Sequence, residues 1–191
     1  ARVWTGYEYA TYDKSTPDMM GKPMVVRPYS HETGAINFLN ISIPAGHDGE
    51  AARKIALDGL FAQPSLPPFV CKQLIQRMVT SNPSPGYVSR VANVFINNGA
   101  GVRGDMKAVV RAILTDPDAR DDSQTENASF GKLREPVVRL VHWAKAFGVK
   151  SPSKTWPFGN TSPGSYRLAQ SPGRAPSVFN WFRPGYTPPG T

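Results

Sequence analysis

The sequence predicts a mainly α-helical fold, and three observations support this prediction. Apolar residues recur at helical spacing through residues 49–148, strand signals are few, and glycine (17) and proline (19) make up about a fifth of the 191 residues. An average protein has roughly 12% of these two residues, so turns and irregular segments must be extensive here. We therefore expect a helical, bundle-like domain of about five helices with Pro/Gly-rich irregular segments at both ends.

The first two helices are predicted between residues 48 and 85. The segment "DGEAARKIALDGLFAQ" (48–63) begins with acidic residues, which favour a helix N-terminus. The segment "PSLPPFVCKQLIQRMVTSNPSP" (64–85) begins with prolines and has apolar residues at helical spacing. It should end at Asn82, because Pro83 disfavours helical backbone angles in the residue before it.

Two further helices are predicted before residue 118. The segment "SPGYVSRVANVFINNGAG" (84–101) has valines at helical spacing and a stop signal at Gly99. The segment "GDMKAVVRAILTDP" (104–117) has Asp105 near its start, and we expect it to end before Pro117.

The fifth helix is predicted in "KLREPVVRLVHWAKAFG" (132–148). At about 100° per residue, Glu135, Arg139 and His142 fall opposite an apolar sector. That sector consists of Leu133, Val137, Leu140, Val141, Ala144 and Phe147, and we expect it to face the core. Pro136 is tolerated because it lies in the first turn, and Gly148 ends the helix.

The remaining segments complete a single predicted domain, residues 1–191. It comprises an irregular lead-in (1–48), a helical core (49–148) and a C-terminal clasp rich in proline and aromatic residues (149–191). Short extended pieces are expected in "MVVRPYS" (24–30) and "NFLNISIPA" (37–45), where proline and asparagine limit strand length.

The clasp contains "LAQSPGRAPSVFNWFRPGYTPPG" (168–190), which has the period of neither a helix nor a strand. Exposed aromatic side chains are costly at roughly 25 cal/mol per Å². We therefore expect Phe179 and Phe182 to pack on the helical core, and Arg174 to pair with Glu135.

The charge of the chain points to an acidic partner. The net charge is +8 and the pI is about 9.8, which favours nucleic acid, an anionic polysaccharide or a membrane surface. Nucleic acid is the weakest of these, because the basic residues are scattered and no zinc-finger, RRM or basic-zipper signature occurs. It would require a basic stripe formed by Lys72, Arg77, Arg90, Arg103 and Lys107. No apolar run is long enough to span a membrane.

Few residues carry recognisable chemistry. The single cysteine, Cys71, lies on an apolar helix face and is predicted to be a core residue. The segment "GNTSPG" has the wrong spacing for a serine-hydrolase nucleophile. Histidine, cysteine and acidic residues are not clustered at ligand spacing, so we expect no metal site and no cofactor.

The candidate catalytic residues are His142, Glu135, His31 and Glu32. Glu135 and His142 share a helix face with Arg139, and an acid/base site would arise if the clasp folded over them. His31 and Glu32 are adjacent in a loop, where His31 could instead tie its loop to the helices by a hydrogen bond. The candidate ligand-binding residues are Arg134, Arg174, Asn180, Trp181 and Arg183.

Several long strings resemble the bacterial domain-of-unknown-function-1800 family. They are "LPPFVCKQLIQRMVTSNPSPGYVSRVANVF", "GVRGDMKAVVRAILTDPDAR", "GKLREPVVRLVHWAKAFG" and "LAQSPGRAPSVFNWFRPGY". The resemblance implies a helical protein that is exported to the periplasm or the extracellular space, often encoded beside alkaline-phosphatase-like or sulfatase-like proteins, with no established catalytic residues. The opening "ARVWTGYEY" resembles a segment well inside family members, so the chain looks like the C-terminal part of a longer protein, whose N-terminal part is an expected partner.

These observations leave three functional hypotheses. The first is a cell-envelope or extracellular module that binds an anionic or carbohydrate polymer. The second is a hydrolase acting on a polysaccharide or an ester, with its site between the fifth helix and the clasp. The third and weakest is nucleic-acid binding.

Overall fold

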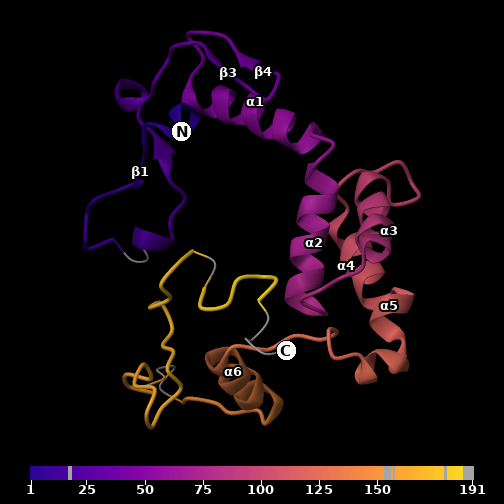
Figure 1. Ribbon diagram of the computed structural model, residues 1–191. Coiled ribbons are helices and arrows are strands. Elements are labelled where there is room, and N and C mark those ends of the chain that lie inside the picture. The colour runs from indigo at the N-terminus through magenta and orange to yellow at the C-terminus, as the bar shows by residue number, and fades with distance from the viewer. Residues whose placement is uncertain (17–18, 153–155, 157, 179, 187–191) are drawn as a thin grey trace. The chain divides into compact units, whose positions relative to one another are not determined.

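The computed structural model describes residues 1–191 except 17–18, 153–155, 157, 179 and 187–191 (Figure 1). The described chain is mainly helical, as predicted. It forms two compact units, Ala1–Leu66 and Pro67–Thr191. The prediction of a single domain therefore stays a prediction.

The described residues of the first unit form two small antiparallel sheets and three short 3₁₀ helices. Strand β1 (Tyr7–Glu8) pairs with β2 (Val25–Val26), and β3 (Ile36–Phe38) pairs with β4 (Ile41–Ile43). The β3–β4 turn consists of Leu39 and Asn40, whose φ angles of 46° and 62° match a two-residue hairpin turn. The 3₁₀ helices are Arg2–Trp4, Met19–Gly21 and Pro28–Ser30. The extended pieces predicted in 24–30 and 37–45 are thus confirmed.

Helix α1 (Gly49–Ala62) covers the second sheet. Its first turn is capped by Asp48, whose Oδ1 accepts a hydrogen bond from the Ala51 N–H (2.8 Å). The buried core of the unit comprises Val3, Ile41, Ile43, Ala52 and Ala56. Gly59 is required for the close approach of α1 to β4, because a Cβ atom there would lie 2.5 Å from Ile41 Cγ1.

The second unit holds the other helices (Figure 1). They are α2 (Leu66–Met78, which begins at the junction of the units), α3 (Pro85–Ile96), α4 (Met106–Thr115), α5 (Pro117–Arg120) and α6 (Pro136–Ala146), with a 3₁₀ helix at Asp122–Glu126. The five helices predicted between residues 48 and 148 are confirmed as α1, α2, α3, α4 and α6. The short α5 was not predicted, because Pro117 was interpreted only as a stop signal. Proline also suits the first position of a helix, and here Asp116 caps that helix.

The core of the second unit is formed by α2, α3 and α4. Its buried side chains include Cys71, Ile75, Tyr87, Val91, Phe95, Val109 and Ile113. The prediction that Cys71 is a core residue is confirmed. Burial raises the pKa of its thiol to about 11, so it is a poor nucleophile at neutral pH.

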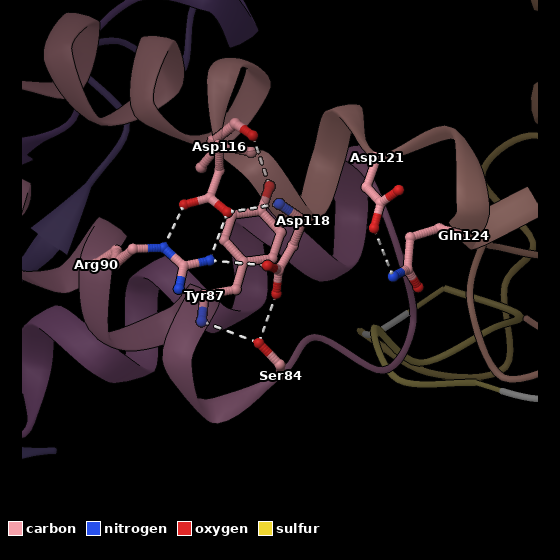
Figure 2. A network of polar contacts seen from close by, with 8 residues as sticks. Ser84, Tyr87, Arg90, Asp116, Asp118, Asp121 and Gln124 are labelled. Atoms are coloured by element: carbon pink, nitrogen blue, oxygen red, sulfur yellow. Dashed lines mark hydrogen bonds and ion pairs between the residues drawn. The ribbon is translucent and has the colours of Figure 1, made fainter.

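A polar network fixes the start of α3 against the α4–α5 junction (Figure 2). The Arg90 guanidinium donates to both carboxylate oxygens of Asp116 (2.9 and 2.7 Å) and to Asp118 Oδ1 (2.9 Å). Ser84 Oγ donates to Asp118 Oδ2 (2.6 Å) and accepts from the Tyr87 N–H. The Tyr87 hydroxyl donates to the Ile113 carbonyl (2.5 Å). Burial, and to a smaller extent the two carboxylates, raise the pKa of Tyr87 to about 12.

The packing of α6 differs from the prediction. Only Val137 of its apolar sector is buried, whereas Val141 and Phe147 are 50% and 73% exposed. The prediction that the whole sector faces the helical core is therefore wrong. Part of the sector instead faces a hollow bounded by Trp156 and Phe158 of the clasp.

The predicted packing of the clasp aromatics Phe179 and Phe182 on the core can be compared with the structure only for Phe182. Phe182 is half-buried, and its ring stacks on Tyr186 with centroids 4.2 Å apart. The other residue expected to pack on the core, Phe179, lies outside the described residues. None of the helices that the structure describes is long and apolar enough to cross a membrane.

Candidate functional site

The start of α6 is joined to the clasp through Glu135. Glu135 precedes the first residue of the helix and is only 5% exposed. Its Oε2 accepts from Asn180 Nδ2 (2.7 Å) and its Oε1 accepts from the Phe182 N–H (3.1 Å). Asn180 has a φ of 70°, a left-handed conformation that asparagine tolerates well.

These contacts correct one expectation. We expected Arg174 to pair with Glu135, but the carboxylate is held by neutral donors of residues 180 and 182, while Arg174 is exposed. The turn in which the Asn180 N–H donates to the Ser177 carbonyl brings the amide side chain to the carboxylate. The clasp does fold against the beginning of α6, as the sequence predicted.

Further hydrogen bonds tie the clasp to the rest of the second unit, among them one from the Val137 N–H of α6 to Gln170 Oε1 (3.1 Å). Arg77 Nη1 donates to the Phe182 carbonyl (3.3 Å), and Ser81 Oγ donates to the Tyr186 carbonyl (3.0 Å). Lys132 Nζ donates to the Pro184 carbonyl (3.5 Å). Burial, followed by the positive charge of Arg77, lowers the pKa of Lys132, although the Glu135 carboxylate acts in the opposite direction.

A hollow of about 440 Å³ lies at this junction, which we call the seam. Its lining combines the polar groups just described with apolar side chains from α2, α4 and α6. They are Arg77, Met78, Leu114, Lys132, Leu133, Arg134, Glu135, Val138, Asn180 and Phe182. The hollow is within the size range of small-ligand sites.

A second hollow, of about 580 Å³, lies beside the first and combines cationic with aromatic groups. We call it the cationic hollow. Its lining residues are Lys132, Leu133, Arg134, Arg139, His142, Trp143, Ala146 and Phe147. The rings of Trp143 and Phe147, one helical turn apart, have centroids 5.5 Å apart and are tilted by 43°. Both rings are largely exposed.

Arg134 and His142 are in contact within the cationic hollow. Arg134 Nη1 lies 3.3 Å from His142 Nδ1. A guanidinium can only donate, so Nδ1 must accept, and the proton of the neutral imidazole lies on Nε2. Two residues predicted for different roles, catalysis and ligand binding, are therefore brought together.

Glu135 and His142 do not show the arrangement expected of a catalytic acid/base pair. Glu135 is buried against Asn180 and Phe182, whereas His142 is exposed and bonded to Arg134. The two side chains share a helix face in the sequence, but the clasp covers only the first of them.

The other two catalytic candidates, His31 and Glu32, lie in the first unit. His31 is 8% exposed, with Nδ1 3.1 Å from the Thr5 carbonyl and 3.3 Å from Thr5 Oγ1. Glu32 is exposed, and its Oε1 accepts from the Gly34 N–H (2.9 Å) and from Arg2 (3.0 Å). The hydrogen bond from Gly34, and then that from Arg2, lower the pKa of Glu32. These contacts tie the His31 loop to Thr5, directly after the 3₁₀ helix Arg2–Trp4, instead of to the helices that the alternative for His31 named.

The remaining ligand-binding candidates lie along the clasp. Arg174 and Arg183 are exposed, and Asn180 and Trp181 are half-buried. Asn180 is engaged by Glu135, so its amide has a structural role. Sequence reasoning missed Lys132, Trp143 and Phe147. The i, i+4 spacing of Trp143 and Phe147 beside Arg139 was a signal that could have identified the aromatic pair.

Two residues of the basic stripe required for nucleic-acid binding make contacts within the chain. Arg90 is paired with Asp116 and Asp118. The Arg103 guanidinium lies over the Phe95 ring, 5.5 Å from its centroid. Within the described parts of the chain, no three histidine, cysteine or acidic side chains are grouped so that they could hold a metal ion.

Comparison with known proteins assigns the family. The family described as a protein of unknown function (DUF1800) matches residues 1–191, the whole chain. The match therefore includes residues 10–65, which lie outside the strings quoted for the resemblance. No curated protein and no solved structure matches the chain. The extent of this match shows that the chain belongs to the DUF1800 family.

Proposed function

We propose that this protein binds an acidic polysaccharide at the cationic hollow, as a module of the cell envelope or the extracellular space. The observation that carries the proposal is the presence of Lys132, Arg134, Arg139 and His142 around the exposed Trp143–Phe147 ring pair. A net charge of +8 supports attraction of a polyanion over a longer range.

The chemistry of the hollow suits a sugar acid. A guanidinium presents paired N–H donors that match the two oxygens of a carboxylate or sulfate. Exposed aromatic rings offer a flat apolar surface on which the C–H face of a sugar ring can pack. Arg139 and Trp143 are one turn apart on α6, so both contacts would be available to one sugar unit or to neighbouring units.

The geometry gives hydrolysis less support than binding. A hydrolase needs an acid and a base that can both reach the scissile bond. Glu135 accepts two hydrogen bonds from the clasp, and His142 Nδ1 is in contact with Arg134. Nucleic acid is also less favoured, because Arg90 is committed to two carboxylates.

The test is a comparison of binding to polygalacturonate and to neutral dextran by isothermal titration calorimetry. The variant Arg134→Ala/Arg139→Ala removes two charges from the hollow. The matched control Lys14→Ala/Lys22→Ala removes two exposed charges from the first unit. We expect the first variant to bind polygalacturonate about tenfold more weakly, from roughly 0.5–1 kcal/mol for each exposed ionic contact, and the control to change binding less than twofold.

Two outcomes would contradict the proposal. Equal weakening in both variants would show that only net charge matters. Tighter binding to single-stranded DNA than to polygalacturonate at equal salt would favour the nucleic-acid alternative. The proposed location has its own test, which is fractionation of the bacterium with an antibody against this protein, where recovery in the cytoplasmic fraction alone would contradict it.

A further inference from the structure

A third hollow lies on the other side of α6 and has a different character. Its volume is about 450 Å³. Its lining shares no residue with that of the cationic hollow, and at about 100° per residue Val141 lies about 160° around the helix from Arg139. A ligand in one hollow therefore does not fill the other, and binding in this apolar hollow does not depend on polysaccharide binding in the cationic hollow.

The end of α6 builds one wall of this apolar hollow. Gly148 has a φ of 62°, the left-handed conformation that commonly ends a helix. The Val149 N–H donates to the Ala144 carbonyl (2.9 Å) and the Gly148 N–H donates to the Lys145 carbonyl (3.1 Å). This is the hydrogen-bond pair of a Schellman motif, and it turns Val149 back over the last helical turn.

Two stacked aromatic rings build the facing wall. Trp156 and Phe158 have centroids 6.0 Å apart and are tilted by only 14°. The Phe158 N–H donates to the Trp156 carbonyl (2.8 Å), which holds the two residues close together. Each ring is about half exposed, as is Val141 opposite. Apolar surface concentrated in this way around a hollow is typical of a ligand site.

The charge of the lining narrows the ligand class. Lys145 is the one charged side chain among the described residues that line the hollow, and it lies in the last turn of α6. An apolar cavity with a single ammonium group at its rim suits an apolar chain that ends in an anion. A cationic amphiphile would meet repulsion, and a free sugar would find few polar partners there.

We propose that the apolar hollow binds the hydrocarbon chain of an acyl carboxylate, with Lys145 facing the carboxylate. The probe is dodecanoate, titrated below its critical micelle concentration against the whole chain by calorimetry, with tryptophan fluorescence as the local signal from Trp156. We expect saturable binding of one dodecanoate, and binding of dodecyltrimethylammonium at least about threefold weaker, which matches the modest value of an exposed ionic contact.

The variants test the location. Val141→Asp places a charge in the apolar lining and should weaken dodecanoate binding at least about tenfold. Ala144→Leu fills the hollow and should have a similar effect, which keeps the test decisive if the first variant does not fold. Lys145→Met should weaken binding about threefold. The control Val178→Asp introduces the same charge at a residue that is 96% exposed and should leave binding unchanged.

The results that would overturn the proposal are equally specific. They are a lack of saturable dodecanoate binding, equal affinity in the folded Val141→Asp and Ala144→Leu variants, or equal affinity for the cationic amphiphile. Polygalacturonate binding is tested with other variants, in the cationic hollow. A failure of that test would therefore leave the dodecanoate result unaffected.

Discussion

Replacement of Glu135 by glutamine should weaken the contact between residues 180–182 of the clasp and the start of α6. Both Glu135 oxygens accept a hydrogen bond, from Asn180 Nδ2 and from the Phe182 N–H. Glutamine has one acceptor oxygen and one NH₂ group, so one of the two donors would face another donor. A hydrogen bond to a buried charged group contributes about 1.5–3 kcal/mol, so we expect a loss of about 2–3 kcal/mol.

The assay is amide hydrogen exchange at Phe182, because its N–H is protected by this contact. A loss of about 2–3 kcal/mol corresponds to roughly 30- to 150-fold faster exchange through local opening of the clasp. Amides in the core of α3, such as that of Val91, should exchange at the original rate. The matched control is Glu126→Gln, which changes an exposed carboxylate. Exchange at Phe182 within about threefold of the original rate would refute the reasoning.

Three other predictions concern the stability of the second unit. Tyr87→Phe leaves the Ile113 carbonyl unpaired and should lower the free energy of unfolding in urea by about 1–3 kcal/mol, whereas Tyr166→Phe, at an exposed position, should change it by less than about 0.5 kcal/mol. Burial raises the pKa of Asp116, but the hydrogen bonds from Arg90 and the Asp118 N–H and the charge of Arg90 outweigh it, so the pKa is lowered. The stabilisation of the folded state by the ionised Asp116 carboxylate is therefore complete above the ordinary aspartate pKa of about 4. It is lost as the pH falls through the lowered pKa of Asp116. Asp116→Asn should reduce this acid sensitivity in urea unfolding, and an unchanged pH profile would contradict it. The pKa values of Cys71 and Tyr87 are raised by burial to about 11 and about 12, so stability should be complete below their ordinary values and fall as the pH rises toward 12. Tyr87→Phe should flatten that fall, as followed by circular dichroism.

Much of the helical structure could be predicted from the sequence, because helices are encoded locally. Apolar period and end signals located α1, α2, α3, α4 and α6. The missed α5 shows the limit of such signals, since Pro117 both ends α4 and begins the next helix. Strand β1 was missed because two residues, Tyr7 and Glu8, carry no periodicity.

The orientation of α6 could not be predicted from its own sequence. Its apolar sector indicated a buried face, but burial depends on what the rest of the chain places beside the helix. The clasp supplies Trp156 and Phe158, and these rings bound a hollow instead of closing a core. The same limit explains Glu135. Its partner is set by the Asn180 turn, which brings together residues 45 positions apart.

The candidate site was also only partly predictable, because some of its residues meet through contacts between distant parts of the chain. Arg134 and His142 could be identified as polar residues near one helix, and the structure brings them together. Lys132 joins them only because the loop before α6 lies against the clasp, where Lys132 contacts Pro184. That contact depends on packing over 52 positions of the chain, and no local pattern encodes it.

The most direct test of the central claim is the affinity for polygalacturonate of Trp143→Ala, with Trp4→Ala as the matched control. Trp4 is about as exposed as Trp143 but lies in the first unit. Because the claim places the sugar ring on the Trp143–Phe147 pair, Trp143→Ala should weaken binding about tenfold while leaving the far-UV circular dichroism unchanged. The control should bind as the unaltered protein does. Equal affinity of both variants and the unaltered protein would contradict the claim that the cationic hollow is the binding site.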